Sequence, residues 1–230
     1  MRQLGSVLVT RPAPGASETA RRLATLGRAA VVAPLLRVRP LAFTPPPGIA
    51  AVLITSGNAV PCLPPSLYGT PLLAVGNATA GRARAAGFTG VHSADGDATA
   101  LAAFASQRCP PEATLLLATA RRQGTALAAA LRDRGFAVHR RAVYTAQPAT
   151  RMPSQAIRAL EDGSLDAALF LSAETAGAFV RLLPMHLTAV LETVDALAIG
   201  EPAAEALRVL PWRRVRVSAK PTLDSILALL

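Results

Sequence analysis

The sequence predicts an α/β protein in which two parallel-sheet domains are joined by a two-stranded hinge. Three observations support this prediction. Short runs rich in leucine and β-branched residues alternate with stretches of helical period, which is typical of parallel sheets covered by helices. The second half of the chain partly repeats the first in a shifted order, and extended segments flank the inserted part. Each domain is therefore expected to be flavodoxin-like or Rossmann-like, with an open sheet between two layers of helices.

The apolar runs predict ten strands, almost all of which end in a small or hydroxyl residue. They lie at residues 6–9, 30–33, 51–54, 71–75, 90–92, 114–118, 137–144, 167–171, 196–199 and 215–217. Helices are predicted to begin near Ser17, Asn58, Ala78, Asp97, Gly124, Glu174, Pro202 and Thr222. Several of these starts carry Ser, Thr, Asp or Asn, whose side chains accept hydrogen bonds from the free N–H groups of a first helical turn.

Four types of segment recur along the chain. Residues 73–80 resemble 197–204, residues 54–59 resemble 171–176, residues 92–95 resemble 217–220, and residues 115–144 resemble 7–36. Their shifted order is explained if one complete domain is inserted after the first strand–helix–strand unit of the other. The alternative is a chance similarity between alanine-rich α/β segments.

This arrangement predicts the domain boundaries. The outer domain comprises residues 1–36 and 149–230, and the inserted domain comprises residues 42–140. Residues 37–41 and 141–148 read as extended segments that carry the chain between the domains. We expect these two linker strands to pair with each other as the hinge.

The composition favours a protein that binds a small anionic molecule. The chain has 230 residues, 51% of them hydrophobic, which is enough to fill a core and excludes a disordered chain. Only 4% are aromatic, which argues against sites that stack sugars or bases on flat rings. The net charge of +10 favours an anionic partner, although the near-exclusive use of arginine also reflects compositional bias. The basic residues come as singles and pairs, so we expect no nucleic-acid partner.

Cysteine and histidine usage predicts neither a disulfide framework nor a metal site. Cys62 and Cys109 lie far apart and are expected to be reduced thiols of a cytoplasmic protein. The three histidines, His92, His139 and His186, stand alone without metal-ligand spacing. The uncharged stretch between Arg39 and Arg82 is interrupted by proline and glycine, so we expect a soluble protein with no membrane partner.

Three familiar catalytic or nucleotide-binding motifs are absent from the sequence. No GxGxxG follows a strand, and the run from Gly76 to Gly81 lacks the Lys-Ser/Thr pair of a phosphate-binding loop. No GxSxG surrounds Ser56 or Ser172. These absences argue against a dinucleotide-dependent dehydrogenase, an NTPase and an α/β-hydrolase, and we expect no cofactor.

Hydroxyl residues gather instead where predicted strands end and helices begin. They are Thr10, Thr55, Ser56, Thr79, Thr119, Ser172 and Thr222. Ligands of open α/β sheets bind at this end of the strands, where helix N-termini present N–H groups and a positive dipole end. Two such rows facing each other across a hinge would form a cleft for a polyanion. For each hydroxyl taken alone, the alternative is an ordinary helix cap.

The same segments resemble the uroporphyrinogen-III synthase family. The similarity runs from residue 7 to residue 230 and is carried by 7–12 (VLVTRP), 53–60 (LITSGNAV), 74–80 (AVGNATA), 143–144 (VY), 170–172 (FLS), 198–200 (AIG) and 221–222 (PT). Each motif alone is short, but their number, order and spacing are specific.

The resemblance implies a cofactor-independent lyase of tetrapyrrole biosynthesis, in the routes to haem, sirohaem and cobalamin. Such an enzyme closes linear hydroxymethylbilane to uroporphyrinogen III, inverting ring D with loss of water. The substrate carries eight carboxylates, in keeping with an anion-binding cleft. The resemblance also implies a monomer, and it leaves open direct transfer of the substrate from hydroxymethylbilane synthase.

The resemblance assigns candidate site residues. Tyr144 matches the tyrosine that is the usual candidate acid, and its alternative role is to pack its ring at the strand end. The residues expected to bind substrate are Thr10, Arg11, Thr55, Ser56, Asn58, Gly76, Asn77, Thr79, Thr119, Arg121, Ser172, Gly200 and Thr222.

The sequence departs from the family at one place. Gly200 is followed by Glu201, Pro202 and Ala203, so the hydroxyl that the family often has at the position of Ala203 is missing. Two other readings stay open: a non-catalytic two-lobed protein that binds a small anion, and a nucleic-acid-associated protein.

Overall fold

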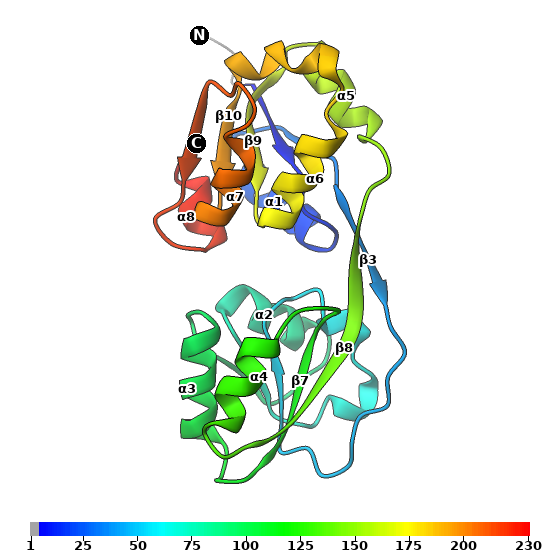
Figure 1. Ribbon diagram of the computed structural model, residues 1–230, viewed down its shortest axis with the longest axis vertical. Helices are drawn as coiled ribbons and strands as arrows, with labels where there is room; N and C mark the ends of the chain where they lie inside the picture. Colours follow the sequence, from blue (N-terminus) through cyan, green and yellow to red (C-terminus); the bar gives the residue numbers. More distant parts are fainter. Residues whose placement is uncertain (1–4) are drawn as a thin grey trace. The chain divides into compact units, whose positions relative to one another are not determined.

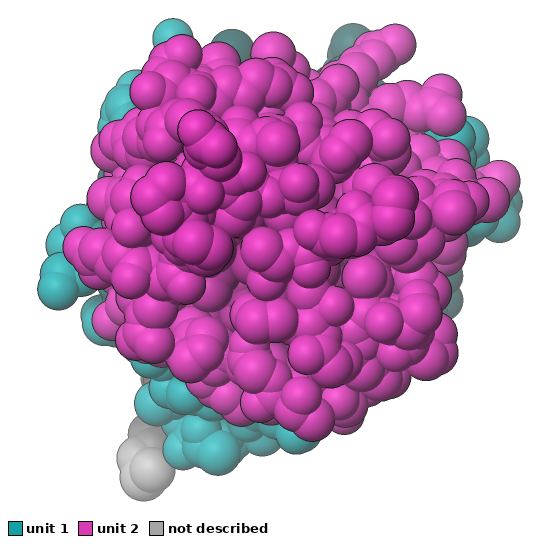
Figure 2. Space-filling view, turned by 90° about the horizontal axis from the view of Figure 1, so that it is seen from below, with its two compact units in different colours: residues 1–37, 147–230 teal, residues 38–146 magenta. Residues whose placement is uncertain are grey.

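The computed structural model describes residues 5–230, which divide into two compact units. Unit 1 contains the chain up to Arg37 and residues 147–230, and unit 2 contains residues 38–146 (Figures 1 and 2). Both boundaries fall inside the segments that the sequence predicts as linkers. No helix in the described chain is long and apolar enough to cross a membrane.

Unit 1 is built on a five-stranded parallel sheet with the order β11-β10-β9-β1-β2. Its strands are β1 (Ser6–Val9), β2 (Ala30–Val32), β9 (Leu165–Phe170), β10 (Asp195–Ala198) and β11 (Arg214–Val217). Its helices are α1 (Gly15–Thr25), α5 (Ser154–Glu161), α6 (Ala173–Leu182), α7 (Glu201–Leu207) and α8 (Leu223–Leu227), with 3₁₀ turns at Met185–Leu187 and Ala189–Thr193.

Both faces of this sheet are buried, which explains why its strands read as continuous apolar runs. On one face, Val9 and Leu169 pack with Leu23 of α1 and Ile226 of α8. On the other, the rings of Phe170, Phe179 and Trp212 lie with their centroids 5.3 to 5.7 Å apart. These contacts hold the helices of unit 1 against the sheet.

Unit 2 contains a six-stranded sheet with the order β3-β8-β7-β4-β5-β6. Its strands are β3 (Leu36–Pro40), β4 (Ala51–Ile54), β5 (Leu72–Ala74), β6 (Val91–Ser93), β7 (Thr114–Ala120) and β8 (Ala137–Pro148). Its helices are α2 (Asn77–Ala85), α3 (Ala98–Arg108) and α4 (Thr125–Arg132), with 3₁₀ turns η1 (Val60–Cys62) and η2 (Pro65–Leu67). Separate apolar clusters fill the two faces of the sheet.

The two sheets have the same strand order when the units are matched by the sequence repeat. Strands β6, β5, β4, β7 and β8 of unit 2 take the places of β11, β10, β9, β1 and β2 of unit 1. In unit 1 the order is the flavodoxin-like one, and in unit 2 the same order is built from a circularly shifted chain. The repeat is therefore confirmed at the level of topology.

Strands β3 and β8 carry the chain between the units and pair with each other. The N–H of Leu41 donates to the carbonyl of Val143 at 2.8 Å, and that of Ala149 donates to the carbonyl of Leu35 at 2.9 Å. The residue numbers of the β8 partners fall as those on the β3 side rise, so the two strands are antiparallel. All ten predicted strands are present, and β3 is the eleventh.

One predicted helix is wrong, and one helix was not predicted. No α-helix begins near Asn58, because Pro61, Pro64 and Pro65 lack the N–H groups that an α-helix needs, and only the short turns η1 and η2 form there. Helix α5 is absent from the predicted helices, although its spacing of buried Ala156, Ala159 and Leu160 gives it a clear apolar face. Its eight residues follow Pro153.

Candidate functional site

The parallel arrangement brings the predicted site residues to one edge of each sheet. We call the carboxyl ends of β1, β9, β10 and β11, together with the helix starts that follow them, the rim of unit 1. The carboxyl ends of β4, β5, β6 and β7, with the helix starts that follow them, form the rim of unit 2. The rim of unit 1 carries Thr10, Arg11, Ser172, Gly200 and Thr222. The rim of unit 2 carries Thr55, Ser56, Asn58, Gly76, Asn77, Thr79, Thr119 and Arg121.

Helix α2 starts at the rim of unit 2 with its first-turn N–H groups unused by any side-chain cap. Gly76 is its N-cap residue, and the described residues place neither a side-chain cap nor an acidic residue in its first turn. Thr79, in that turn, is half-buried. An N-terminus of this kind favours an anion, since both the free N–H groups and the helix dipole attract one. The nearby carboxylate of Asp95 accepts a hydrogen bond from the Asn77 amide at 2.7 Å.

A cation that sequence reasoning missed also lies at this rim. A Cβ atom at Gly57 would lie 2.5 Å from Nη1 of Arg82, so the guanidinium of this α2 residue covers the end of β4. Beside it, the hydroxyl of Ser56 accepts from the N–H of Asn58 at 3.2 Å. No sequence signal marks Arg82, because its contact with Gly57 depends on how α2 packs.

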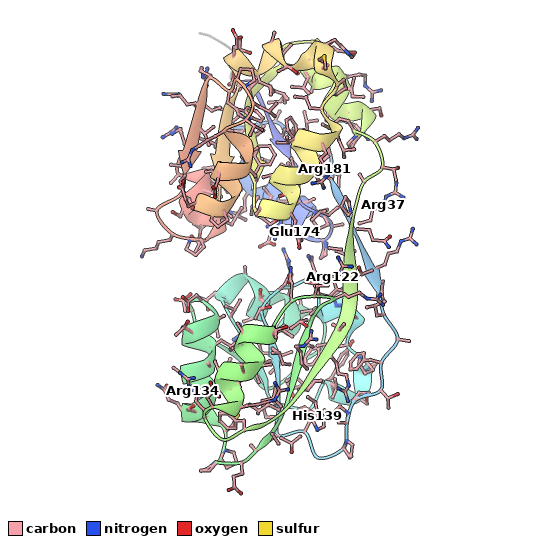
Figure 3. The ribbon with its side chains drawn as sticks, in the orientation of Figure 1. Arg37, Arg122, Arg134, His139, Glu174 and Arg181 are labelled. Atoms are coloured by element: carbon pink, nitrogen blue, oxygen red, sulfur yellow. The ribbon has the colours of Figure 1, made fainter. Side chains whose placement is uncertain are left out.

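The turn between β7 and α4 holds two further arginines at the rim of unit 2. Buried Thr119 donates its hydroxyl to the carbonyl of Gln123 at 3.2 Å, and Arg140 of β8 donates to the same carbonyl at 2.9 Å. Gly124 has a φ of 81°, and a Cβ there would also lie 2.6 Å from Thr119 Cγ2. The turn is thereby fixed with Arg121 and Arg122 exposed. Figure 3 labels Arg122.

At the rim of unit 1, the residues after β1 are used inside the fold. Thr10 is fully buried, and its hydroxyl donates to the carbonyl of Leu169 at 2.6 Å, which ties β1 to β9. Nη1 of Arg11 lies 3.3 Å from the hydroxyl of Thr19, to which it donates. A Cβ at Gly15 would lie 2.5 Å from Arg11 Nε, so this guanidinium crosses the start of α1.

The other hydroxyls of this rim act as helix caps. Ser172 accepts from the N–H of Thr175 at 3.1 Å, and Thr222 accepts from the N–H of Ser225 at 3.2 Å. Gly200 caps α7 through its backbone alone, and the side chain of Glu201 pairs with Arg208. Side chains at the rim of unit 1 thus accept hydrogen bonds from the free N–H groups of two of its own helix starts.

Tyr144 lies on β8, paired with Ala120 of β7. Its side chain belongs to the apolar core of unit 2, and the residue is only 3% exposed. Its backbone carbonyl accepts from the N–H of Arg121 at 2.8 Å, which helps to hold the β7–α4 turn. This burial favours the alternative that the ring packs in the core. The backbone hydrogen bond with Arg121 connects Tyr144 to the rim.

The two cysteines are poor nucleophiles in this fold. Burial raises the pKa of both Cys62 and Cys109 above the usual thiol value. Their reactive thiolate forms are therefore scarce at neutral pH.

A comparison with known protein families identifies the family of this chain. The family described as uroporphyrinogen-III synthase HemD matches residues 17–228, which covers both units and the linking strands. The chain belongs to the uroporphyrinogen-III synthase family. The resemblance seen in the sequence is confirmed, and the family places the protein among the lyases of tetrapyrrole biosynthesis.

Solved structures of this family share the fold. Uroporphyrinogen-III synthetase from Helicobacter pylori aligns with 98% of this chain and 97% of its own at 18% identity, with a TM-score of 0.63. A mutant uroporphyrinogen-III synthase from the extremely thermophilic bacterium Thermus thermophilus aligns with 97% of this chain and 96% of its own at 22% identity, with a TM-score of 0.49. No functionally curated protein matches. The Helicobacter structure supports the two-domain parallel-sheet fold.

Proposed function

We propose that this protein catalyses the cyclisation of linear hydroxymethylbilane to uroporphyrinogen III, with inversion of ring D and loss of water. The observation that carries the proposal is the family match across residues 17–228. The paired α/β units, each with one rim of helix starts and hydroxyls, are consistent with a substrate that bears eight carboxylates.

We propose that the substrate carboxylates bind mainly to the rim of unit 2. That rim offers the N-terminus of α2 together with Arg82, Arg121 and Arg122. Guanidinium groups and helix N–H groups form charge-assisted hydrogen bonds with carboxylates, which are about twice as strong as neutral ones. At the rim of unit 1, Arg11 supplies a further contact.

The chemistry requires protonation of the leaving hydroxyl, stabilisation of a cationic azafulvene, and attack by the substituted carbon of ring D to form a spiro pyrrolenine. The linear substrate closes unaided to the wrong isomer, so positioning of ring D is the main task of the protein. We propose Tyr144 as the acid that assists loss of the hydroxyl. A phenol with a pKa of about 10 is a weak acid, so its contribution is modest.

The decisive experiment supplies hydroxymethylbilane to the purified protein without metal or nucleotide and identifies the porphyrin isomer after oxidation. The expected product is type III. Type I product alone, formed at the spontaneous rate, would refute the proposal. In that case, tight binding of the bilane without turnover would favour the anion-binding protein, and salt-sensitive binding of duplex DNA would favour the nucleic-acid-associated one.

A further inference from the structure

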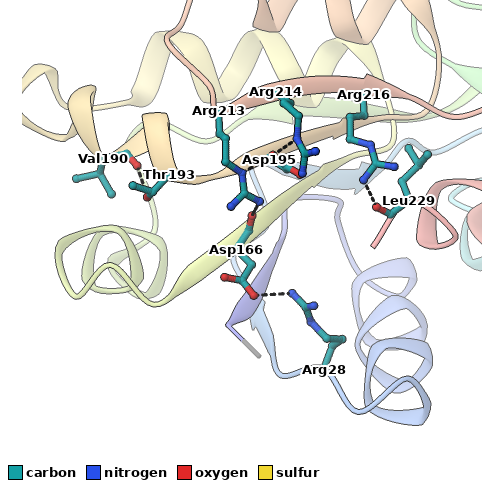
Figure 4. Close-up of polar contacts among 9 residues, drawn as sticks. All are labelled: Arg28, Asp166, Val190, Thr193, Asp195, Arg213, Arg214, Arg216 and Leu229. Carbon is teal, nitrogen blue, oxygen red and sulfur yellow. Dashed lines mark hydrogen bonds and ion pairs between the residues drawn. The ribbon is translucent and has the colours of Figure 1, made fainter. Parts of the chain in front are cut away.

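A second cluster of arginines lies in unit 1, at the edge of the sheet opposite its rim. A cavity of about 240 Å³ opens there, where β9, β10 and β11 begin. Its charged lining consists of Arg28, Arg213, Arg214, Arg216, Asp166 and Asp195 (Figure 4). We call this cavity the arginine pocket.

Asp195 shares its single charge between two guanidiniums. Its side chain is 6% exposed, and its carboxylate accepts from Arg213 Nε at 2.7 Å and from Arg214 Nη2 at 2.7 Å. Burial raises the pKa of Asp195, but the hydrogen bonds and charges of the two arginines outweigh it and bring the pKa to about 2. One carboxylate therefore neutralises one of the two guanidiniums and leaves one positive charge over.

Arg28 is the most unusual member of the pocket. Its side chain is only 9% exposed, and its Nη2 donates to Asp166 Oδ2 at 3.0 Å. The same oxygen accepts from the N–H of Gly5 at 2.6 Å. Nε of Arg28 is buried and has no hydrogen-bond partner within residues 5–230. A buried N–H without a partner is unfavourable, and an acceptor that reached it would remove this cost.

Arg216 brings a charge that no side chain of the pocket neutralises. It donates through Nη1 to the backbone carbonyl of Leu229, just beyond α8. The side chains of the pocket lining therefore include four guanidiniums and two carboxylates, a side-chain excess of two positive charges. Guanidinium groups keep their charge at every physiological pH. The C-terminal end of α1, close to Arg28, offsets only a fraction of one charge.

We propose that the arginine pocket binds a phosphate dianion, either free or as the terminal group of a phosphomonoester. Two negative charges match the side-chain excess, and a tetrahedral oxyanion can accept from more than one guanidinium at once. The volume exceeds that of one phosphate and leaves room for an attached group. The pocket lies at the opposite edge of the sheet from the rim, so the proposal is independent of how the bilane binds.

Binding would connect segments that are distant in sequence. Arg28 follows α1, Arg213 and Arg216 lie at β11, and Arg216 also contacts the segment after α8. A phosphate held by guanidiniums from more than one of these segments would therefore stabilise unit 1 against unfolding.

The test is calorimetric titration of the full chain with inorganic phosphate at constant ionic strength, accompanied by thermal unfolding. We expect saturable binding at one site, and an unfolding midpoint raised by roughly 3 to 6 °C at a phosphate concentration of about ten times Kd. Glycerol phosphate forms the second arm. Equal binding of both ligands indicates a site for phosphomonoesters, and binding of inorganic phosphate alone indicates the free ion.

Matched variants locate the site. Arg216→Gln and Arg28→Gln should weaken phosphate binding at least tenfold. Arg208→Gln removes an exposed arginine of unit 1 that pairs with Glu201 outside the pocket, and it should leave Kd within twofold. Arg82→Gln, at the rim of unit 2, should do the same. If Arg28→Gln fails to fold because Asp166 loses its partner, Arg216→Gln still decides.

Two results would overturn the proposal. The first is the absence of saturable phosphate binding by the unaltered protein. The second is unchanged binding in Arg216→Gln combined with loss in Arg82→Gln, which would place the anion at the rim of unit 2. Either result leaves the isomer assay unaffected, because that assay reports on a different edge of the protein.

Discussion

The two units share one topology but prepare their rims in opposite ways. In unit 1, each of the four helices that follow a rim strand has an acidic residue in its first turn. These residues are Glu18, Glu174, Glu201 and Asp224. In unit 2, whose residues 38–146 are all described, α2, α3 and α4 have none there. Only α3 has an acidic N-cap residue, Asp97.

This difference shows how a repeated fold can keep its shape and change its chemistry. A carboxylate in the first turn occupies the positive end of a helix and disfavours an external anion. Unit 1 therefore uses its own acids for stability, whereas unit 2 leaves the N-termini of α2 and α4 without side-chain caps and adds exposed arginines. The fold is common to both units, and the features that favour a polyanion at a rim lie mainly in unit 2.

The largest expected effect on activity comes from placing an acidic residue in the first turn of a unit 2 helix, as in the rim helices of unit 1. Thr79→Asp places a carboxylate in the first turn of α2, where it occupies the anion site and repels the substrate. We expect kcat/KM to fall at least a hundredfold, while the unfolding midpoint stays or rises because the acid complements the helix dipole. Thr79→Asn is the uncharged control and should keep kcat/KM within tenfold. A harmless Thr79→Asp would remove α2 from the binding rim.

The next effect concerns Tyr144, whose place in the repeat is taken by Leu36 in unit 1. If its hydroxyl assists departure of the substrate hydroxyl, Tyr144→Phe should lower kcat by roughly tenfold to a hundredfold. The product should remain type III, since positioning is unchanged. Steady-state kinetics and isomer analysis measure both. A kcat within twofold of the unaltered protein would assign Tyr144 to packing alone, in keeping with its burial.

A smaller effect should separate the arginines of the two rims. Arg82→Gln should raise KM about tenfold, the lower end of what a lost charge-assisted hydrogen bond produces. Arg11→Ala should raise KM about threefold with little change in kcat, because its guanidinium also donates to Thr19 within unit 1. Equal effects of the two substitutions would contradict the unequal division of binding between the units.

The smallest effect is on stability in acid. The pKa of Asp195 is lowered to about 2 in the fold, so its contribution is complete above the ordinary pKa of an aspartate and is lost as the pH falls from about 4 to about 2. After allowance for solvent screening, this contribution is roughly 1 to 2 kcal/mol. Urea unfolding at pH 7 and at pH 2.5 measures how far the free energy of unfolding falls in acid. This fall should be smaller in Asp195→Asn than in the unaltered protein. An identical loss in both proteins would show that Asp195 is not the group responsible.

The sequence by itself determined the alternation of strands and helices, the repeat, and which candidate residues follow the ends of strands. Buried parallel strands must be apolar throughout, so they are readable as short runs between helices. The order of the repeated segments carries topological information, which is why the insertion of one domain into the other follows from the chain alone. Residues that directly follow parallel strands must share an edge, so Ser172 and Gly200, or Ser56 and Gly76, come together without any knowledge of packing.

Tertiary structure alone decided which of these residues face inward and which cations join them. The packing of α2 brings Arg82 over the distant Gly57, and the pairing of β10 with β11 brings Asp195 to Arg213 and Arg214. The local sequence around Thr10 and Tyr144 does not distinguish them from exposed residues at the ends of strands, yet both are buried. Side-chain contacts between distant segments depend on the angles and distances at which helices and strands pack, and local sequence does not encode these separately from the whole fold.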